Sequence, residues 1–246
     1  MSLSRSTSLK RLTADLLPGM PVSSAWLAQR GVSPQLAYRY VKSGWLARLA
    51  RGVFAKPGNL LDRDHSLRLL VELGYTVHVG GKTALAWHGF RYNLLLGSEL
   101  LTLYKHGGRN LPRWFTTRFR CRVTSRLLFN ESFERLLHVT ETNPEHAGVP
   151  VSEPERAALE MLSEIPRRQD VEEAEQLMES LVSLRRDVMR DLLMHCKSVK
   201  TVRLLLHFSR KLNLPVLENL PVDQLPTGSK SRYVRKLPHG TLVLKQ

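Results

Sequence analysis

Residues 31–58 read GVSPQLAYRYVKSGWLARLARGVFAKPG, and they predict a helix followed by a β-hairpin. The helix is expected to begin at Ser33 and Pro34, because serine caps a helix N-terminus and proline suits the first helical position. It ends at Gly44. Its apolar side chains fall on one face, at positions 36, 37, 40 and 41. The residues that follow are apolar at 45, 46, 49, 53 and 54, and they predict two short strands joined at Arg51 and Gly52.

A shorter helix over residues 25–30 precedes this stretch, so the order of elements is that of a winged helix-turn-helix. Residues 30–56 carry six Lys and Arg and no acidic residue, which favours a polyanionic partner over an ordinary solvated surface. The polar face of the longer helix and the hairpin tip would contact base edges and phosphates. The predicted DNA-binding residues are Ser33, Gln35, Tyr38, Arg39, Lys42, Arg48 and Arg51. The alternative for the two tyrosines is that Tyr38 and Tyr40 both pack in the core.

The whole chain is strongly basic: 37 Lys and Arg against 22 Asp and Glu give a net charge of +15 over 246 residues. Residues 1–125 carry a net +14, residues 126–200 a net −5 and residues 201–246 a net +6. The basic half therefore points to nucleic acid or another polyanion. No apolar run is long enough to cross a bilayer, and the N-terminus has no secretory signal pattern. We expect a cytoplasmic protein with no membrane partner.

The rest of the pattern predicts an α+β protein. A helix over 62–73, a strand over 77–79 and a short helix after Gly80 and Gly81 precede a strand-rich region at 94–139. Helices are predicted at 153–164, 170–182, 185–195 and 198–212, and the last residues predict two strands around a Pro-His-Gly turn. We expect an N-terminal winged helix-turn-helix domain over residues 1–92. A mixed α/β C-terminal domain over 93–246, with short strands and a helical segment, follows it.

No group of residues predicts catalysis, a metal site or a cofactor. Gly80–Thr83 resembles the end of a phosphate-binding loop, but the first glycine of that motif is replaced by Thr76. Gly97–Ser98 resembles the start of a nucleotidyltransferase site, yet only Glu99 is close enough to help bind Mg²⁺. The nine histidines are scattered, and each is better explained by packing or hydrogen bonding. The two cysteines are far apart, and we expect reduced thiols.

Three further basic stretches are candidates for contact with nucleic acid or a partner protein. Residues 105–114 form a glycine-rich basic loop, in which Trp114 either stacks on a base or packs in the core. Arginines alternate at 118, 120 and 122, so a strand through them would place three cations on one face. The third stretch lies near the C-terminus. The candidate contact residues are Lys105, Arg109, Arg113, Arg118, Arg120, Arg122, Lys230, Arg232 and Arg235.

Several motifs, in order along the chain, resemble those of the AbiEi antitoxin family. Gly44-Trp45-Leu46 follows the predicted longer helix, and Arg51-Gly52-Val53-Phe54 forms the wing, with Phe54 in place of the more usual tyrosine. Thr83-Ala84-Leu85 with Trp87-His88-Gly89 is similar to a further family segment. SEPERAALEML, residues 152–162, resembles the family's Pro-Glu-Arg-Ala-x-Leu-(Glu/Asp) helix. The ordered set is more specific than any one of these motifs.

This resemblance implies a bacterial antitoxin of a type IV system, whose N-terminal domain binds inverted repeats in its own promoter and represses transcription. It also implies a C-terminal domain that neutralises a cognate AbiEii toxin, a nucleotidyltransferase-like protein, with or without a stable complex, in abortive infection against phage. No enzymatic activity and no cofactor are expected. The implied partner is double-stranded DNA, bound by a monomer or a weak dimer. The alternatives are a ligand-responsive transcription factor without a toxin and an RNA-binding or RNA-processing protein.

Overall fold

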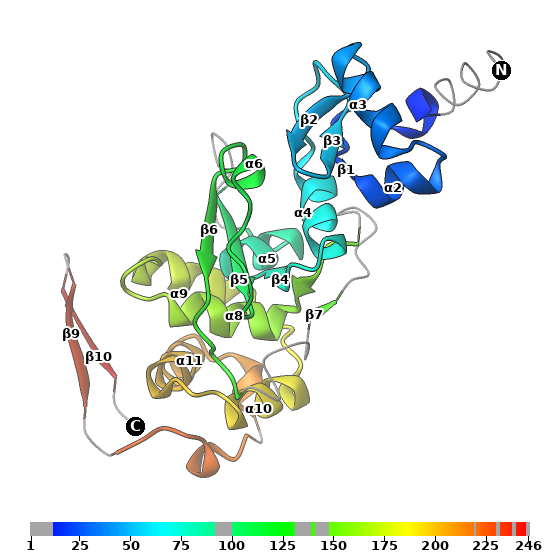
Figure 1. Ribbon diagram of the computed structural model, residues 1–246. Helices are drawn as coiled ribbons and strands as arrows, with labels where there is room; N and C mark the ends of the chain where they lie inside the picture. Colours follow the sequence, from blue (N-terminus) through cyan, green and yellow to red (C-terminus); the bar gives the residue numbers. More distant parts are fainter. Residues whose placement is uncertain are drawn as a thin grey trace. The chain divides into compact units, whose positions relative to one another are not determined.

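The computed structural model describes residues 12–91, 100–130, 139–140, 148–218, 220–229, 232–237 and 240–244. The chain forms two compact units, and each unit is made from several stretches of sequence (Figure 1). Unit 1 comprises residues 1–76, 108–120 and 142–149. Unit 2 comprises residues 77–107, 121–141 and 150–246. The chain therefore passes between the two units several times, and neither unit is one continuous N-terminal or C-terminal stretch.

Unit 1 is built on a winged helix-turn-helix. Its elements in chain order are β1 (Val22–Ser23), α2 (Ser24–Gln29), α3 (Pro34–Lys42), β2 (Ala47–Ala50), β3 (Val53–Ala55), α4 (Arg63–Glu72) and α6 (Arg113–Thr116). The predicted hairpin of β2 and β3 is confirmed, and β1 adds a third strand, in the order β1-β3-β2. Both pairings are antiparallel. Strand β1 thus ties the entry of α2 to the hairpin, which sets the helices against the wing.

The core of the winged helix is one cluster of apolar side chains from its helices and its sheet. The cluster contains Leu12, Leu16, Val22, Leu27, Val32, Ala37, Tyr40, Leu46 and Phe54. Helix α3 contributes Ala37 and Tyr40 to the cluster, and Leu36 and Val41 of the same helix pack against the cluster. The predicted apolar face of α3 is therefore confirmed, and burial of that face stabilises the helix in its place. The opposite face of α3 is left to solvent.

Local hydrogen bonds explain where the two helices of the motif begin. The Oγ of Ser23 accepts from the backbone N–H of Trp26 at 3.1 Å, and the Oγ of Ser33 accepts from that of Leu36 at 3.2 Å. These serines satisfy N–H groups that have no partner within their own helix. Between the helices, Gly31 has φ 76°, a left-handed conformation that favours glycine. The turn that orients α3 is thus encoded locally.

Unit 2 contains a mixed five-stranded sheet in the order β6-β5-β4-β8-β7. The strands are β4 (Val77–Val79), β5 (Leu101–Lys105), β6 (Cys121–Thr124), β7 (Val139–Thr140) and β8 (Val151–Ser152). The central strand, β4, pairs antiparallel with β5 and parallel with β8. Strands β5 and β6 are parallel, so the chain makes a crossover through α6 between them. The sheet is therefore assembled from segments far apart in the sequence.

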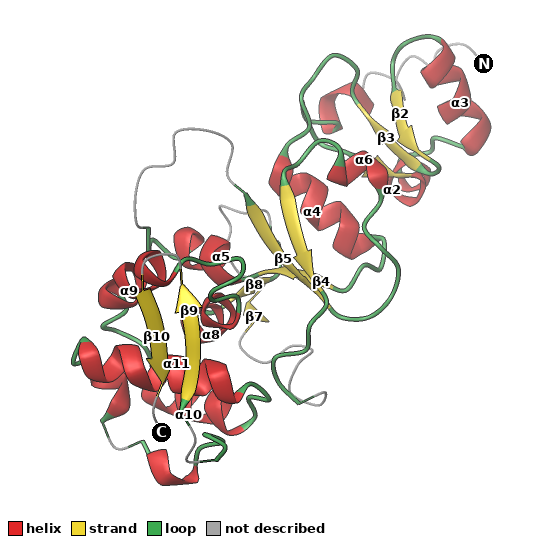
Figure 2. Ribbon diagram, turned by 90° about the vertical axis from the view of Figure 1, so that its left-hand side faces the viewer, coloured by secondary structure: helices red, strands yellow, loops and turns green. Residues whose placement is uncertain are grey.

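Helices of this unit pack on one another, and two of them also contact the sheet (Figure 2). They are α5 (Gly81–Trp87), α8 (Pro154–Ser163), α9 (Val171–Ser180), α10 (Arg186–Met194) and α11 (Val199–Lys211). Helix α8 contacts all four of the others, and every residue from 155 to 163 is buried. Short 3-10 turns at Pro215–Leu217 and Val222–Gln224 lead to the hairpin of β9 (Tyr233–Leu237) and β10 (Gly240–Leu244), which contacts α11. The expected α+β fold and the four predicted C-terminal helices are confirmed.

One predicted strand is wrong in its extent. Strand β6 begins at Cys121, so Arg118 and Arg120 do not lie on it and do not form a strip with Arg122. The backbone N–H groups of Arg118 and Phe119 instead donate to the carbonyl of Phe115 at 3.0 Å each, which closes the last turn of α6. The Phe119 ring lies 4.9 Å from that of Phe115. The alternation of side chains at 118–123 therefore spans a helix end and a strand.

The compact units differ from a division of the chain at residues 92 and 93. Residues 77–91 belong to unit 2, because they supply its central strand β4 and helix α5. Residues 108–120, with α6, belong to unit 1 although they follow that point in the sequence. No helix among the described residues is long and apolar enough to cross a membrane.

Candidate nucleic-acid interface

Helix α3 presents a polar face to solvent. Gln35, Tyr38, Arg39 and Lys42 are all exposed, and Tyr38 keeps 58% of its surface accessible whereas Tyr40 keeps 8%. The two tyrosines therefore have different places: Tyr40 belongs to the core and Tyr38 to the surface. These four exposed residues include two cations and no carboxylate, so the face is suited to an anionic partner.

Two residues of this face lie one helical turn apart and contact each other. The Lys42 Nζ lies 5.0 Å from the centre of the Tyr38 ring, within the range of a cation–π interaction. At an exposed site this attraction is weak, so Lys42 is free to move toward a phosphate. The exposed Tyr38 ring offers both an apolar face and a hydroxyl to a base edge.

The N-terminus of α3 adds a second electropositive feature. Ser33 is exposed and its Oγ accepts from Leu36, which leaves the hydroxyl hydrogen available for a phosphate oxygen. The first turn of the helix contains no acidic residue, and Arg39 and Lys42 lie in its last turn. A helix N-terminus of this kind attracts anions through its free N–H groups. The predicted role of Ser33 is compatible with its capping hydrogen bond.

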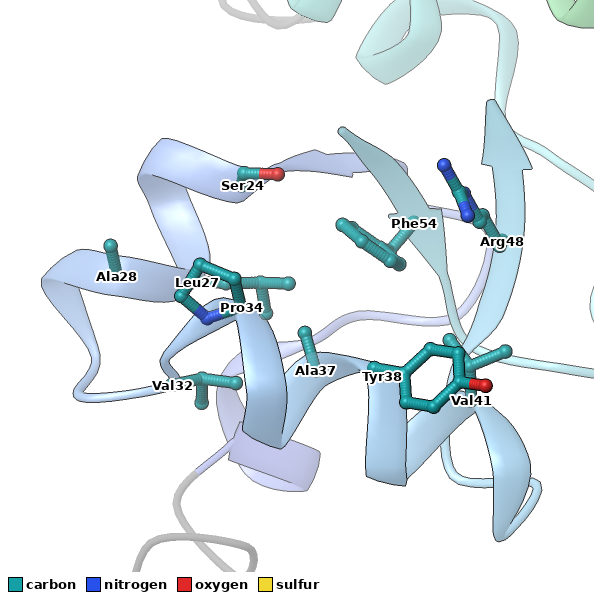
Figure 3. A pocket seen from close by; sticks show the side chains of 10 residues that line it. All are labelled: Ser24, Leu27, Ala28, Val32, Pro34, Ala37, Tyr38, Val41, Arg48 and Phe54. Atoms are coloured by element: carbon teal, nitrogen blue, oxygen red, sulfur yellow. The ribbon is translucent and has the colours of Figure 1, made fainter. Parts of the chain in front are cut away.

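The hairpin of the wing carries two more exposed arginines. Arg48 on β2 is exposed and its Nε donates to the carbonyl of Ala50 at 3.4 Å, while Arg51 is exposed in the turn itself. Arg48 and Tyr38 line a common hollow of about 300 Å³ between the helices and the sheet (Figure 3). The floor of this hollow is apolar and includes Leu27 and Phe54. Arg48 thus lies within β2 and not at the hairpin tip where the sequence placed it, and it shares this hollow with Tyr38 of α3.

The loop at 105–114 has a more structural role. Trp114 is 5% exposed and packs edge-on against Phe115, so its ring belongs to the core and is not available to stack on a base. The guanidinium of Arg109 lies 4.1 Å from the centre of the Tyr75 ring and also donates to the carbonyl of Leu73. Arg109 therefore holds this loop against the end of α4.

The remaining basic candidates are not brought together in one site. Arg113, Arg118 and Arg120 are exposed in unit 1, where the Nη1 of Arg118 donates to the carbonyl of Trp114 at 3.0 Å. Lys105, Arg122 and Arg232 lie in unit 2. Lys230 and the side chain of Arg235 lie outside the described residues. Contact of these residues with nucleic acid or a partner stays a prediction.

A buried polar network in unit 2 was not predicted from the sequence. The Oε1 of Glu160 accepts from Arg156 Nε at 2.9 Å and lies 3.0 Å from His78 Nε2, while its Oε2 accepts from Ser152 Oγ at 2.9 Å and from the backbone N–H of Gly81 at 3.0 Å. Glu160 and Arg156 are fully buried. Burial raises the pKa of Glu160, but its interactions with His78 and Arg156 outweigh burial and lower the pKa to about 2.

His78 in this network is expected to be neutral at neutral pH. Burial lowers the pKa of His78 below its ordinary value, with Glu160 opposing the shift. If His78 Nε2–H donates to the carboxylate, its Nδ1 accepts, and His106 Nε2 lies 2.9 Å from it as the donor. The one local signal in the sequence was the pair Arg156 and Glu160, which lie one helical turn apart among apolar residues at 157–159 and 161–162, a spacing at which opposite charges meet.

This network also explains the segment that resembles a phosphate-binding loop. The carboxylate of Glu160 accepts from the first turn of α5, and a Cβ on Gly80 would lie 2.2 Å from Glu160 Oε2. The place that a phosphate would take at this helix is therefore filled by the chain's own side chain. Within the described residues, no group of three or more His, Cys, Asp or Glu could hold a metal ion. Cys121 and Cys196 are free thiols.

Two family descriptions match the sequence and together span nearly all of it. Residues 5–96 match the AbiEi antitoxin N-terminal domain, and residues 98–246 match the transcriptional regulator, AbiEi antitoxin, of type IV toxin–antitoxin systems. Among solved structures, the RV2827C protein from Mycobacterium tuberculosis has the same fold, with a TM-score of 0.58 and 16% identity over 92% of this chain and 86% of that one. A search of curated protein sequences found no match. The chain belongs to the AbiEi antitoxin family of type IV toxin–antitoxin transcriptional regulators.

Proposed function

We propose that this protein binds the promoter of its own toxin–antitoxin operon through unit 1 and represses transcription. The observation that carries the proposal is the exposed, acid-free face of α3, with Arg48 of the wing beside it. A helix of this kind enters the major groove, where each base pair shows a distinct pattern of donors and acceptors. Membership of a family of transcriptional regulators supports it. A promoter as the target implies a cytoplasmic location.

Each side chain of the interface has a chemical task in this proposal. The guanidinium of Arg39 suits two acceptors on a guanine, and the amide of Gln35 suits an adenine. Lys42, Ser33 and the wing arginines contact phosphates, which fix the position of the helix but read no sequence. Binding is therefore expected to weaken steeply with salt. Inverted repeats are filled by a weak dimer or by two monomers that bind together.

The experiment is a fluorescence-anisotropy titration of the upstream DNA and of a scrambled duplex across a salt series. Arg39→Ala is expected to weaken specific binding by about 1–3 kcal/mol and Lys42→Ala to reduce the salt slope by about one. Arg68→Ala is the matched control, because it removes the same charge from an exposed position on α4, where Arg68 pairs with Glu72 at 3.2 Å. Equal effects of Arg39→Ala and Arg68→Ala would show that only overall charge matters.

We also propose that residues 93–246 neutralise a nucleotidyltransferase-like AbiEii toxin. They act together with β4 and α5, on which they pack. The family description, which names a type IV toxin–antitoxin system, supports this role. The test is growth rescue in cells that express the toxin from a foreign promoter. The full chain carrying Arg39→Ala and Lys42→Ala should still restore growth. Loss of rescue by this variant would tie neutralisation to DNA binding instead.

A further inference from the structure

Unit 2 has a polar pocket of about 520 Å³ at the C-terminal end of α8. Four cations line it, and one carboxylate accompanies them: Arg126, Arg167, Arg168, Lys200 and Glu164. Tyr233, the first residue of β9, also lines the pocket. The pocket is separate from the Glu160 network, because none of the residues that hold that carboxylate lines it.

The positive charge of this pocket is not balanced by its own carboxylate. Glu164 Oε2 lies 3.6 Å from Arg168 Nη1, a loose pair. Arg126 and Arg167 are exposed, and their side chains make no ion pair with a described residue. Cations held close together repel one another, which costs stability unless an anion offsets it. The arrangement therefore favours an anionic ligand.

The backbone around the pocket is held in place by hydrogen bonds. Lys200 Nζ donates to the carbonyls of Ser163 and Ile165 at 2.7 and 2.5 Å, which fixes the ammonium at the end of α8. The Nη1 of Arg122 donates to the carbonyl of Arg168 at 2.9 Å. Arg122, a predicted contact residue, thus supports the segment that carries Arg167 and Arg168. A site whose backbone is fixed in advance loses less entropy when it binds.

We propose that this pocket binds a nucleotide through its phosphate group, either a free nucleotide or the 5′-phosphorylated end of an RNA strand. Arginine guanidinium groups match the oxygens of phosphate and bind them with charge-assisted hydrogen bonds. The volume lies in the range of small-molecule pockets and exceeds the need of an inorganic ion. Tyr233 supplies an aromatic ring of the kind on which bases stack. This site does not depend on DNA binding by α3.

The test is calorimetric titration of the full chain with adenosine 5′-monophosphate at physiological salt. Saturable binding at one site is expected, and Arg126→Gln with Arg167→Gln should weaken it at least tenfold. Arg210→Gln is the matched control, since Arg210 is exposed on α11 and lies outside the pocket, and it should leave binding unchanged. Both pocket arginines are exposed, so the fold should persist, and thermal unfolding verifies this.

Further probes test base and phosphate recognition separately, and they distinguish a free nucleotide from the end of an RNA strand. Tyr233→Leu should weaken binding of the nucleotide while binding of inorganic phosphate stays the same. A short RNA with a 5′-phosphate that binds at least tenfold more tightly than the free nucleotide, with the same dependence on the arginines, identifies a strand end as the ligand. Comparable affinities identify the free nucleotide. The proposal is overturned if neither probe binds, if the double substitution has no effect, or if only duplex DNA or an acidic peptide binds there.

Discussion

Replacement of Glu160 by glutamine tests the buried network of unit 2 directly. Glutamine has the same shape, but its NH₂ group is a donor and must replace one of the two carboxylate oxygens. One oxygen is bound by His78 and Arg156 and the other by Gly81 and Ser152, so either placement sets a donor against donors. Arg156 then remains buried without a counter-charge. Removal of one partner from a buried ion pair costs about 3–5 kcal/mol.

The pKa of Glu160 gives a second route to the magnitude. The folded protein lowers this pKa from 4.5 to about 2, and each pKa unit corresponds to about 1.4 kcal/mol, so the ionised form contributes about 3 kcal/mol. Because the folded pKa is lowered, this stability is present above pH 4.5 and is lost as the pH falls toward 2. The two routes agree on a cost of about 3 kcal/mol at neutral pH.

The assay is urea unfolding followed by circular dichroism, at pH 7 and at steps down to pH 3. Glu160→Gln should lower the unfolding free energy of unit 2 by about 3 kcal/mol, or its melting temperature by about 6–12 °C. The variant should also lose part of the decline in stability at acid pH. Glu179→Gln, an exposed change on α9, is the control. An unfolding free energy within about 1 kcal/mol of the parent protein would refute this account of the network.

Three further outcomes are expected. Ser33→Ala removes the cap of α3 and should cost about 1 kcal/mol of unit 1 stability in urea unfolding, whereas an unchanged midpoint would contradict the capping role. Tyr38→Ala should weaken binding of the upstream DNA at least threefold while the melting temperature stays the same, because Tyr38 is 58% exposed; a fall in melting temperature without a change in affinity would place Tyr38 in the core instead. Burial raises the pKa of Glu155, but hydrogen bonds from Arg185 outweigh it and lower that pKa below its ordinary value, so this pair stabilises above the ordinary pKa and loses its effect as the pH falls through the folded pKa. Arg185→Ala should therefore flatten the pH dependence of unfolding at acid pH, and a pH profile equal to that of the parent protein would count against the pair.

The sequence predicted those features that depend on neighbouring residues. Serine caps and glycine turns around α3 are local, and so is the periodicity that places Ala37 and Tyr40 inside and Arg39 and Lys42 outside. The helices from α8 to α11 also begin and end close to their predicted residues, because their apolar periodicity repeats over several turns. Fold class and the exposed polar face of α3 follow from such patterns.

Features that depend on distant residues were not predicted. His78 and Glu160 are 82 positions apart, and no local pattern predicts that they meet. The prediction of a strand through Arg118 was wrong, because alternation over a few residues does not distinguish a strand from a helix end. Trp114 was left open between core and surface for a similar reason, since its burial depends on packing that only the tertiary structure supplies.

The central position of β4 has a consequence for truncated forms of this protein. A fragment that begins at residue 93 lacks β4, which separates the pair β5 and β6 from the pair β7 and β8. Each remaining pair is a two-stranded ribbon, and such ribbons are rarely stable alone in water. A nascent chain likewise cannot complete this sheet before β8 has left the ribosome. Gene fusions and deletion series that divide the chain at residue 93 would thus measure misfolding, whereas point substitutions in the full chain separate its activities.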